Sequence, residues 1–290
     1  MRLVVTGAGG FLGWRTAELL EGRGHEVVRV TRPGGVRRRF ARAGAEADAG
    51  DPAARRLLAG CDAVLHFAGI PDPARGRADP AWAVRMNAGT TLNLLEGCLE
   101  HGCGLVYPST VRAADPPDPY ALSKRLGEDV CRLHRAPAAV VRLTSVFGPG
   151  QVAREGATGA ISSFAACALA GEPIVLPGNP HRTRDFVYVD DVVGALERLV
   201  AGARWNETFT LASGAATPLV EAAELVRAAA GSSVPVETPG GALPAGEDAS
   251  YAATPEAPGL GFDVRPLDEA VRLYVDWLRG YSAAESGSRA

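Results

Sequence analysis

The chain has 290 residues, enough for about two domains of ordinary size. Apolar residues make up 47% and charged residues 22%, which excludes intrinsic disorder for the bulk of the chain. With 30 basic and 33 acidic residues the formal net charge is −3, so no global field would attract DNA, RNA or an acidic membrane surface. We therefore expect neither nucleic acid nor a membrane among the partners.

The cysteines and the apolar runs indicate a cytoplasmic protein without a metal site. The cysteine count is odd and no CxxC motif occurs, so the sequence predicts reduced, buried thiols rather than a disulfide framework or a zinc site. No apolar run approaches the ~20 residues of a membrane helix. The N-terminal run from Met1 to Thr6 is too short for a signal peptide and leads directly into a glycine turn.

Short apolar strands alternate with helices through the first half of the chain. The pattern predicts strands over 3–6, 26–30, 63–67, 105–107 and 138–143, and helices over 11–21, 52–58, 82–101 and 120–134. Strands that alternate with helices indicate an α/β fold, in which a parallel sheet is covered on both faces.

The second half of the chain is less regular. Helices are predicted over 158–170, 190–201, 218–230 and 267–278, and stretches rich in proline and glycine occur at 177–180 and 235–258. The small, polar residues 283–290 predict a disordered tail.

A glycine-rich turn between the first strand and the first helix points to phosphate binding. In Thr6-Gly-Ala-Gly-Gly-Phe-Leu-Gly13, Gly7 permits a tight turn, Gly10 lets backbone N–H groups approach a pyrophosphate, and Gly13 lets the helix pack against the strand. The helix begins at Phe11 and Leu12 and directs its unpaired donors at the anion. This strand–turn–helix arrangement predicts a dinucleotide site.

The end of the second strand favours NADP over NAD. An NAD site needs an acid here to hold the ribose hydroxyls, but the chain reads Val30-Thr31-Arg32-Pro33. The Arg32 guanidinium is suited to a 2′-phosphate, and Arg37, Arg38 and Arg39 follow closely. The alternative is that Arg32 stacks on adenine and that the other three arginines are solvated, in which case NAD remains possible.

Tyr120 and Lys124 form the predicted catalytic pair. Residues four apart share a helix face, and a nearby ammonium favours the phenolate of a tyrosine. Tyr120 can then exchange a proton with an oxygen whose carbon exchanges hydride with a nicotinamide. Lys124 is the only lysine; the other 29 basic residues are arginine. Ser109 and Thr110 end the preceding strand, where Thr110 can donate a hydrogen bond to the reacting oxygen.

These motifs together resemble the extended short-chain dehydrogenases/reductases, the NAD-dependent epimerase/dehydratase family that mostly modifies nucleotide sugars. The matching segments are 6–13, 50–51, 66–69, 87–93, 109–110, 120–124, 142–150 and 183–191. The resemblance implies a Rossmann-type, doubly wound NAD(P)-binding domain over 1–150. A smaller substrate-binding α/β domain would cover 151–282, with 185–202 packing back on the first.

The resemblance also assigns roles to individual residues. Thr110, Tyr120 and Lys124 would be catalytic. Asp51 would contact the adenine amine, Phe67, Ala68 and Gly69 would line the dinucleotide cleft, and Asn87 would support the helix and a proton relay. Ser109, Thr110, Ser145 and Arg184 would contact the substrate, Arg184 through a nucleotide diphosphate.

Three departures from the family pattern bear on the substrate. The loop between Thr110 and Tyr120 is short and carries three prolines, as in deoxysugar 4-ketoreductases. Ser145 replaces an asparagine, and 240–247 lacks an arginine that many relatives use to hold the diphosphate. Because this loop is stiff and short, we expect Arg184 to bind the substrate, with His181 or Arg182 as further candidates.

The sequence therefore predicts hydride transfer at carbon 4 of a nucleotide-linked hexose, with a ketoreductase favoured over an epimerase. Two alternatives stay open: a reductase of a non-sugar ketone, and a catalytically silent NADP-binding regulator. Apolar residues on helices 82–101 and 120–134, beyond what one sheet face would cover, predict a homodimer.

Overall fold

The computed structural model describes residues 1–35, 42, 44–71, 73–153, 159–244 and 247–287, with side chains described up to residue 282. The predicted positions Arg37–Arg39 lie outside the described residues. The chain forms two compact units, each built from separate segments. Unit 1 comprises Met1–Leu143, Val192–Leu211 and Pro255–Phe262, and unit 2 comprises Thr144–Asp191, Ala212–Thr254 and Asp263–Ala290.

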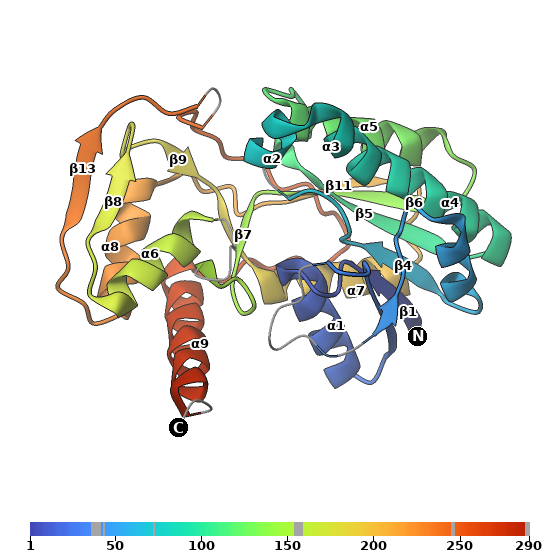
Figure 1. Ribbon diagram of the computed structural model, residues 1–290, viewed down its shortest axis with the longest axis horizontal. Helices are drawn as coiled ribbons and strands as arrows, with labels where there is room; N and C mark the ends of the chain where they lie inside the picture. Colours follow the sequence, from blue (N-terminus) through green and yellow to red (C-terminus); the bar gives the residue numbers. More distant parts are fainter. Residues whose placement is uncertain (36–41, 43, 72, 154–158, 245–246, 288–290) are drawn as a thin grey trace. The chain divides into compact units, whose positions relative to one another are not determined.

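A seven-stranded parallel sheet forms the centre of unit 1 (Figure 1). Its order is β11-β6-β5-β4-β1-β2-β3, and every neighbouring pair is parallel. The strands are β1 Arg2–Thr6, β2 Glu26–Thr31, β3 Ala45–Glu46, β4 Ala63–His66, β5 Gly104–Thr110, β6 Ala138–Leu143 and β11 Thr208–Leu211. This confirms the predicted α/β class, and the parallel register brings the carboxyl ends of the strands to one edge.

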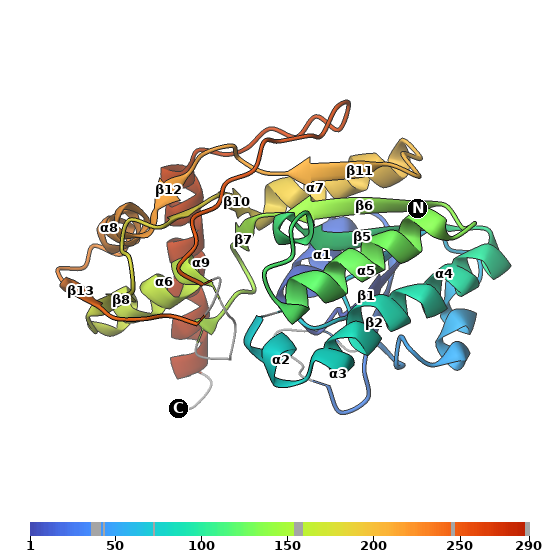
Figure 2. The same cartoon turned by 90° about the horizontal axis from the view of Figure 1, so that it is seen from above.

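Helices cover both faces of this sheet. The helices α4 (Thr90–His101) and α5 (Pro119–Leu133) lie on one face, whereas α1 (Phe11–Gly22) and α7 (Val189–Ala201) lie on the other (Figures 1 and 2). Every residue of β4 and β5 is buried, as expected for strands covered on both sides.

Some elements differ from the sequence prediction. The helix predicted over 82–101 is three consecutive segments: α3 (Pro80–Val84), a π-helical turn η2 (Arg85–Gly89) and α4. The short α2 (Pro73–Ala78) was not predicted, and the segment 52–58 is a 3-10 helix, η1 (Pro52–Leu58). A further 3-10 turn, η3 (Val111–Ala113), follows β5.

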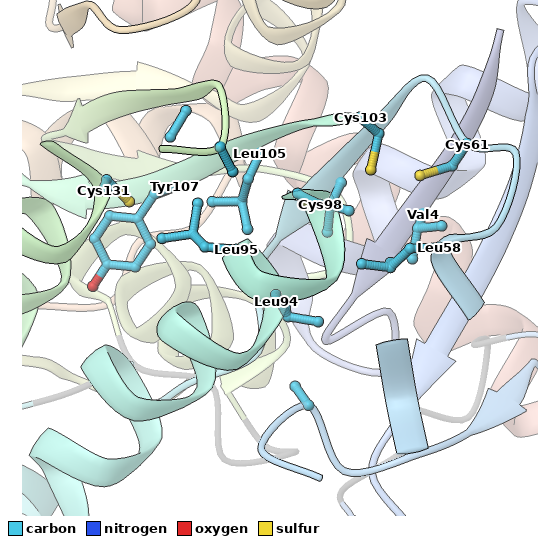
Figure 3. Close-up of a cluster of buried hydrophobic side chains, with 14 of the residues drawn as sticks. Val4, Leu58, Cys61, Leu94, Leu95, Cys98, Cys103, Leu105, Tyr107 and Cys131 are labelled. Atoms are coloured by element: carbon cyan, nitrogen blue, oxygen red, sulfur yellow. The ribbon is translucent and has the colours of Figure 1, made fainter. Parts of the chain in front are cut away.

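The core of unit 1 lies between the sheet and the helices α4 and α5 (Figure 3). Tyr107 from β5 and Leu94 and Leu95 from α4 are almost fully buried in it. Complete burial of one such side chain stabilises the fold by roughly 1.5–3 kcal/mol. The core therefore fixes α4 and α5 against the strands whose ends carry the predicted site.

The described part of unit 2 contains short strand pairs and the helices α6, α8 and α9. Its elements are β7 Ser145–Phe147, α6 Ala160–Ala170, β8 Ile174–Pro177, β9 Thr183–Arg184, β10 Phe186–Tyr188, β12 Thr217–Pro218, α8 Leu219–Ala229, β13 Val236–Gly240 and α9 Leu267–Gly287. The ring of Phe147 meets those of Phe186, Tyr188 and Tyr274 edge to face, with centroids 5.8–6.2 Å apart.

The division of the chain differs in detail from the predicted boundaries 1–150 and 151–282. Unit 1 ends its first segment at Leu143, and the segment that returns to it is 192–211 rather than 185–202. It returns because β11 extends the sheet beside β6. A second return, 255–262, was not predicted; Glu256 there forms a β-bridge with Thr210 of β11. The predicted tail 283–290 also differs, since α9 continues to Gly287.

Candidate active site

The glycine turn after β1 is shaped by its contacts with the rest of unit 1. Gly7 has φ +67°, and a Cβ there would lie 2.6 Å from the backbone of Phe67. A Cβ on Gly13 would collide with the carbonyl of Gly7. Both glycines are therefore required by packing, because only a hydrogen fits between the turn, the end of β4 and α1.

Gly10 has a different surrounding. It is exposed, and a Cβ there would meet only the Gly7 carbonyl oxygen, at 3.4 Å. Gly10 is also the N-cap of α1 and provides no side-chain cap, so Phe11 and Leu12 open the helix with unpaired N–H groups. Such a helix start suits an anion, and the turn therefore fits the pyrophosphate of a dinucleotide.

The carboxyl end of β2 carries a hydroxyl that the sequence reasoning overlooked. Thr31 is 7% exposed, and its Oγ1 has no hydrogen-bond partner among the described residues. The following residue, Arg32, is exposed. A buried hydroxyl without a partner is unfavourable unless a ligand satisfies it. Threonine and arginine together offer donors, which fits a phosphate at this end of the strand.

A chain of hydrogen bonds joins the ends of β1 and β4 to α4. The Ala68 N–H donates to Thr6 Oγ1 (3.2 Å), which contacts His66 Nδ1 (2.8 Å); His66 Nε2 contacts Thr90 Oγ1 (3.2 Å). Thr90 itself donates to the Met86 carbonyl (2.7 Å), so His66 must donate from Nε2 and accept at Nδ1. Burial, followed by the charge of Lys124, lowers the pKa of His66 to about 3, which keeps the ring neutral.

This chain places the segment 67–69, the predicted lining of the dinucleotide cleft. Phe67 and Ala68 are half-buried and Gly69 is exposed, immediately after β4. Gly69 has φ +154°, and a Cβ there would overlap the side chain of Asn87. The three residues therefore present mainly backbone at the carboxyl edge of the sheet.

Asn87 supports the site from the π-helical turn η2. Its Oδ1 accepts from the Ile70 N–H (2.8 Å), and its Nδ2 donates to Ser123 Oγ (2.8 Å) on α5. Ser123 Oγ donates to the Tyr120 carbonyl (2.7 Å). Asn87 is 1% exposed, and these bonds tie the segment after β4 to α5, while its predicted part in cofactor binding and a proton relay stays a prediction.

Asp51 caps η1. Its Oδ1 accepts from the Ala53 N–H at 2.8 Å, and its side chain is otherwise exposed. The backbone around it is held by Asn93 of α4, whose Nδ2 donates to the carbonyls of Ala49 (2.8 Å) and Asp51 (3.0 Å). Asn93 is a second positioning residue to which the sequence reasoning gave no role of its own.

Tyr120 lies in the first turn of α5. Asp118 caps this helix by accepting from the Ala121 N–H (2.9 Å), and Asp118 forms an ion pair with Arg112. The backbone of Tyr120 is approached closely by α2: a Cβ on Gly76 would lie 2.8 Å from the Tyr120 Cβ. The glycine in α2 thus lets a helix that the sequence did not predict support the start of α5.

Lys124 follows one turn later on the same face of α5. Its Nζ donates to the Pro108 carbonyl at 2.6 Å and lies 4.6 Å from the centre of the Tyr107 ring. Desolvation lowers the pKa of Lys124 to about 8, against the opposing charge of Glu128. The contacts with Pro108 and Tyr107 place the Lys124 nitrogen at the carboxyl end of β5.

Ser109 and Thr110 differ because successive residues of a strand face opposite sides of the sheet. Thr110 Oγ1 accepts from the Arg112 N–H (3.3 Å), which leaves its hydroxyl proton to donate elsewhere. Ser109 Oγ donates to the buried carboxylate of Glu128 at 2.6 Å. The structure therefore corrects the predicted role of Ser109: its donor supports α5 instead of reaching a substrate.

The carboxylate of Glu128 is itself fully buried and strongly bound. It accepts from Arg142 Nε (2.9 Å) and from one terminal nitrogen each of Arg142 and Arg132 (both 2.7 Å). Together with the bond from Ser109, these bonds join α5 to β5 and β6.

The remaining predicted residues belong to unit 2. Ser145 begins β7 and is half-buried. The Arg184 guanidinium donates to the carbonyls of Thr183 (2.8 Å), Ala249 (2.6 Å) and Glu247 (2.8 Å) and lies 4.3 Å from the centre of the Tyr251 ring. Arg184 therefore organises the segment 247–251, and its contact with a substrate stays a prediction.

Its neighbours Arg182 and His181 have different surroundings. Arg182 is 7% exposed and donates to the carbonyls of Pro177 and Asn179, both at 2.7 Å. His181 is exposed. Of the two candidates named for the substrate, only His181 has a side chain that is open to solvent.

Asp185 holds the strand pairs of unit 2 together. It is fully buried and accepts from the Ser213 N–H and Oγ (both 2.8 Å), the Gly214 N–H (3.0 Å) and Thr144 Oγ1 (3.3 Å).

No group of three or more histidine, cysteine or acidic residues that could hold a metal ion occurs within the described part of the chain. Within the same residues, no helix combines the length and apolar character required to cross a membrane.

The sole lysine allows a direct test of this geometry. In protein labelled with ¹³C-lysine, we expect the Lys124 Cε signal to titrate near pH 8 when folded and near the ordinary ~10.4 in urea. Because the unfolded chain then binds the proton more tightly, the free energy of unfolding should rise between these two pH values. Lys124→Met should lack this rise. A folded midpoint above pH 10 would contradict the desolvation of Lys124.

The chain resembles proteins of known function that share this fold. A family model described as the NAD dependent epimerase/dehydratase family matches residues 3–210. A dTDP-4-dehydro-6-deoxy-D-allose reductase of Streptomyces bikiniensis is 27% identical over 316 residues, covering 97% of each chain. A UDP-glucose 4-epimerase of Mycolicibacterium smegmatis is 27% identical over 261 residues, covering 80% of this chain and 83% of the relative.

The fold matches solved structures as well. The UDP-glucose 4-epimerase of Thermus thermophilus, solved in complex with NAD, superimposes with a TM-score of 0.81 at 26% identity, covering 97% of this chain and 99% of that chain. The matched family segment includes the glycine turn, the Tyr120–Lys124 helix and the sheet between them. The sequence resemblance is thus confirmed, and the chain belongs to the NAD-dependent epimerase/dehydratase family.

Proposed function

We propose that this protein is an NADP(H)-dependent 4-ketoreductase of a nucleotide-linked deoxyhexose. The observation that carries the proposal is the placement of Lys124, the only lysine, one turn after Tyr120 and against the carbonyl of Pro108. This arrangement favours an enzyme over a catalytically silent NADP-binding regulator, because a regulator would not need a lysine beside the tyrosine. A relationship over 97% of each chain to a reductase of a dTDP-4-keto sugar is compatible with the ketoreductase. The exposed Arg32 after β2, where an NAD site would carry an acid, favours NADPH and therefore a reductase over an epimerase.

The cofactor would be held by unit 1. The N–H groups that open α1 after Gly10 would bind the pyrophosphate, Thr31 and Arg32 the adenosine 2′-phosphate, and Asp51 the adenine. Phe67, Ala68 and Gly69 would line the cleft. When bound, the nicotinamide supplies the hydride.

The chain's own residues would then handle the proton. Tyr120 donates its phenolic proton to the carbonyl oxygen of the substrate, while Thr110 donates a hydrogen bond to the same oxygen. The Lys124 ammonium stabilises the resulting phenolate by Coulomb attraction. In the reverse direction Tyr120 accepts the proton, so the same residues would also serve an epimerase that keeps its cofactor.

Removing the phenol tests this mechanism. Tyr120→Phe should lower turnover by about 10²–10⁴ because a general acid is lost, with the dissociation constant for the cofactor nearly unchanged. Tyr281→Phe on α9 is the matched control and should keep full turnover. Steady-state kinetics and cofactor fluorescence titration measure the two quantities; an active Tyr120→Phe enzyme excludes this tyrosine from the chemistry.

The cofactor preference is tested at the end of β2. Arg32→Ala should weaken the binding of NADPH by roughly 10–100-fold, which corresponds to about 1.5–3 kcal/mol. The affinity for NADH should be unchanged. Thr31→Val should act in the same direction, because it removes the buried hydroxyl. Arg56→Ala, an exposed arginine on η1, is the control. Tighter binding of NADH than of NADPH to the parent protein would argue for NAD and against the proposed phosphate site.

The nucleotide half of the substrate is tested by calorimetry on the cofactor-loaded protein. We expect UDP or dTDP to bind, and Arg184→Ala to weaken binding by about 1.5–3 kcal/mol. Because Arg184 also holds the segment 247–251, Tyr251→Leu separates the two effects. It removes the stacking surface but keeps the guanidinium, and should weaken binding less. If no nucleoside diphosphate binds at millimolar concentration, the non-sugar ketone becomes the better substrate class.

We also propose a homodimer formed through α4 and α5. Five leucines on these helices are more than one-third exposed: Leu92, Leu99, Leu122, Leu126 and Leu133. The two helices lie side by side on one face of unit 1 (Figure 2), and a second copy would remove this apolar surface from water. Light scattering at micromolar concentration should give a dimer, and Leu126→Glu a monomer. Leu273→Glu on α9 is the control; a monomeric parent protein would contradict the proposal.

A further inference from the structure

Three cysteines gather at the edge of the sheet opposite the proposed active site. Cys61 precedes β4, Cys103 precedes β5, and Cys98 lies in the last turn of α4; we call these residues the thiol cluster. They are 7%, 2% and 0% exposed. The first residues of β4 and β5, Ala63 and Gly104, are paired in register, which brings the two preceding segments together. The cluster is at the amino ends of the strands, so the proposed catalysis does not use it.

The three sulfur atoms interact with one another. Cys103 hydrogen-bonds with both Cys61 and Cys98, and its sulfur points toward that of Cys61 (Figure 3). The Cys103 N–H also donates to the Cys98 carbonyl (3.1 Å), which fixes the turn between them. Each thiol has only one proton to donate, so the sulfur that contacts both others is best placed to accept from both.

The electrostatic surroundings favour Cys103 as the thiolate. The hydrogen bonds from Cys61 and Cys98 lower the pKa of Cys103 against the opposing effect of burial, and the nearby His101 also lowers it. The hydrogen bond to Cys103, together with burial, raises the pKa of Cys61 and of Cys98. Opposite pKa shifts of this kind are typical of a nucleophilic thiol whose hydrogen-bond partners stay protonated.

The cluster is buried but shallow. Gly60, Asp62, His101 and Gly102, which lie within two residues of Cys61 or Cys103, are all exposed, and Cys61 itself is 7% exposed. A small neutral oxidant needs to pass only this layer, whereas a bulky alkylating reagent does not fit as readily.

We propose that Cys103 is a reactive thiol which a hydroperoxide oxidises and which then forms a disulfide with Cys61. The Cys103 thiolate attacks the O–O bond, and sulfenic acid forms as hydroxide leaves. The Cys61 sulfur then attacks the sulfenic sulfur, an S–S bond forms, and water departs with the Cys61 proton. One hydroperoxide is reduced by two electrons for each disulfide formed, and Cys98 stabilises the thiolate by hydrogen bonding.

The disulfide would join the entrances of two neighbouring central strands. It would close a chain loop that contains β4, the π-helical turn and α4, and such a cross-link stabilises mainly by restricting the unfolded chain. We therefore expect oxidation to raise the melting temperature of the protein by several degrees.

The test is peptide mapping of the full-length protein after treatment with one molar equivalent of hydrogen peroxide. Free thiols are blocked with N-ethylmaleimide under denaturing conditions, and the linked peptides are identified by mass spectrometry. Cys167 in unit 2 is the more exposed internal reference, because it is half-buried while the other four cysteines are buried. We expect a Cys61–Cys103 linkage while Cys167 is still alkylated.

Variants separate the roles within the cluster. Cys103→Ser should abolish rapid peroxide consumption, Cys98→Ser should slow it at least several-fold, and Cys131→Ser, in the same core, should leave it unchanged. Oxidation of Cys167 before Cys103, or a disulfide from Cys103 to Cys98, would overturn the proposal. The wild-type peptide map decides these outcomes even if a variant fails to fold. The result is also independent of which substrate the enzyme reduces.

Discussion

The buried carboxylate of Glu128 is the interaction on which the proposed site depends. It lies under the centre of α5 and accepts hydrogen bonds from Ser109 on β5 and from Arg142 on β6. Removing one partner of such a buried pair costs about 3–5 kcal/mol, because an uncompensated charge stays behind. The carboxylate thus fixes the helix that carries Tyr120 and Lys124 on the strand that ends in Thr110.

The other supports of the site share one property: their hydrogen-bonding capacity is used within the protein. Asn87 ties the segment after β4 to α5, and His66 joins β1, β4 and α4 as a neutral ring. Thr31 is the exception, because its hydroxyl is buried without a partner in the described structure. An unsatisfied hydroxyl at the carboxyl end of β2, next to the exposed Arg32, favours a ligand there.

Local rules made much of this arrangement predictable. The glycine turn and the Tyr120–Lys124 spacing depend on backbone geometry within a few residues, and the alternation of strands and helices indicates the parallel sheet. The strand alternation could also have shown that Ser109 and Thr110 face opposite sides. The partners of Arg184 and the orphan hydroxyl of Thr31 depend on contacts between distant segments, which no local pattern encodes. The same holds for β11, a four-residue strand that exists because β6 offers it an edge.

The path of the chain between its two units has an evolutionary consequence. The chain passes from one unit to the other five times, at residues 143, 191, 211, 254 and 262. Neither unit is therefore one continuous stretch of gene that recombination could exchange as a module. A new specificity in this architecture has to arise by substitution in place, on short loops such as 247–251, which Arg184 of the same unit anchors. With this topology, related enzymes diverge in substrate while they keep the whole two-unit chain.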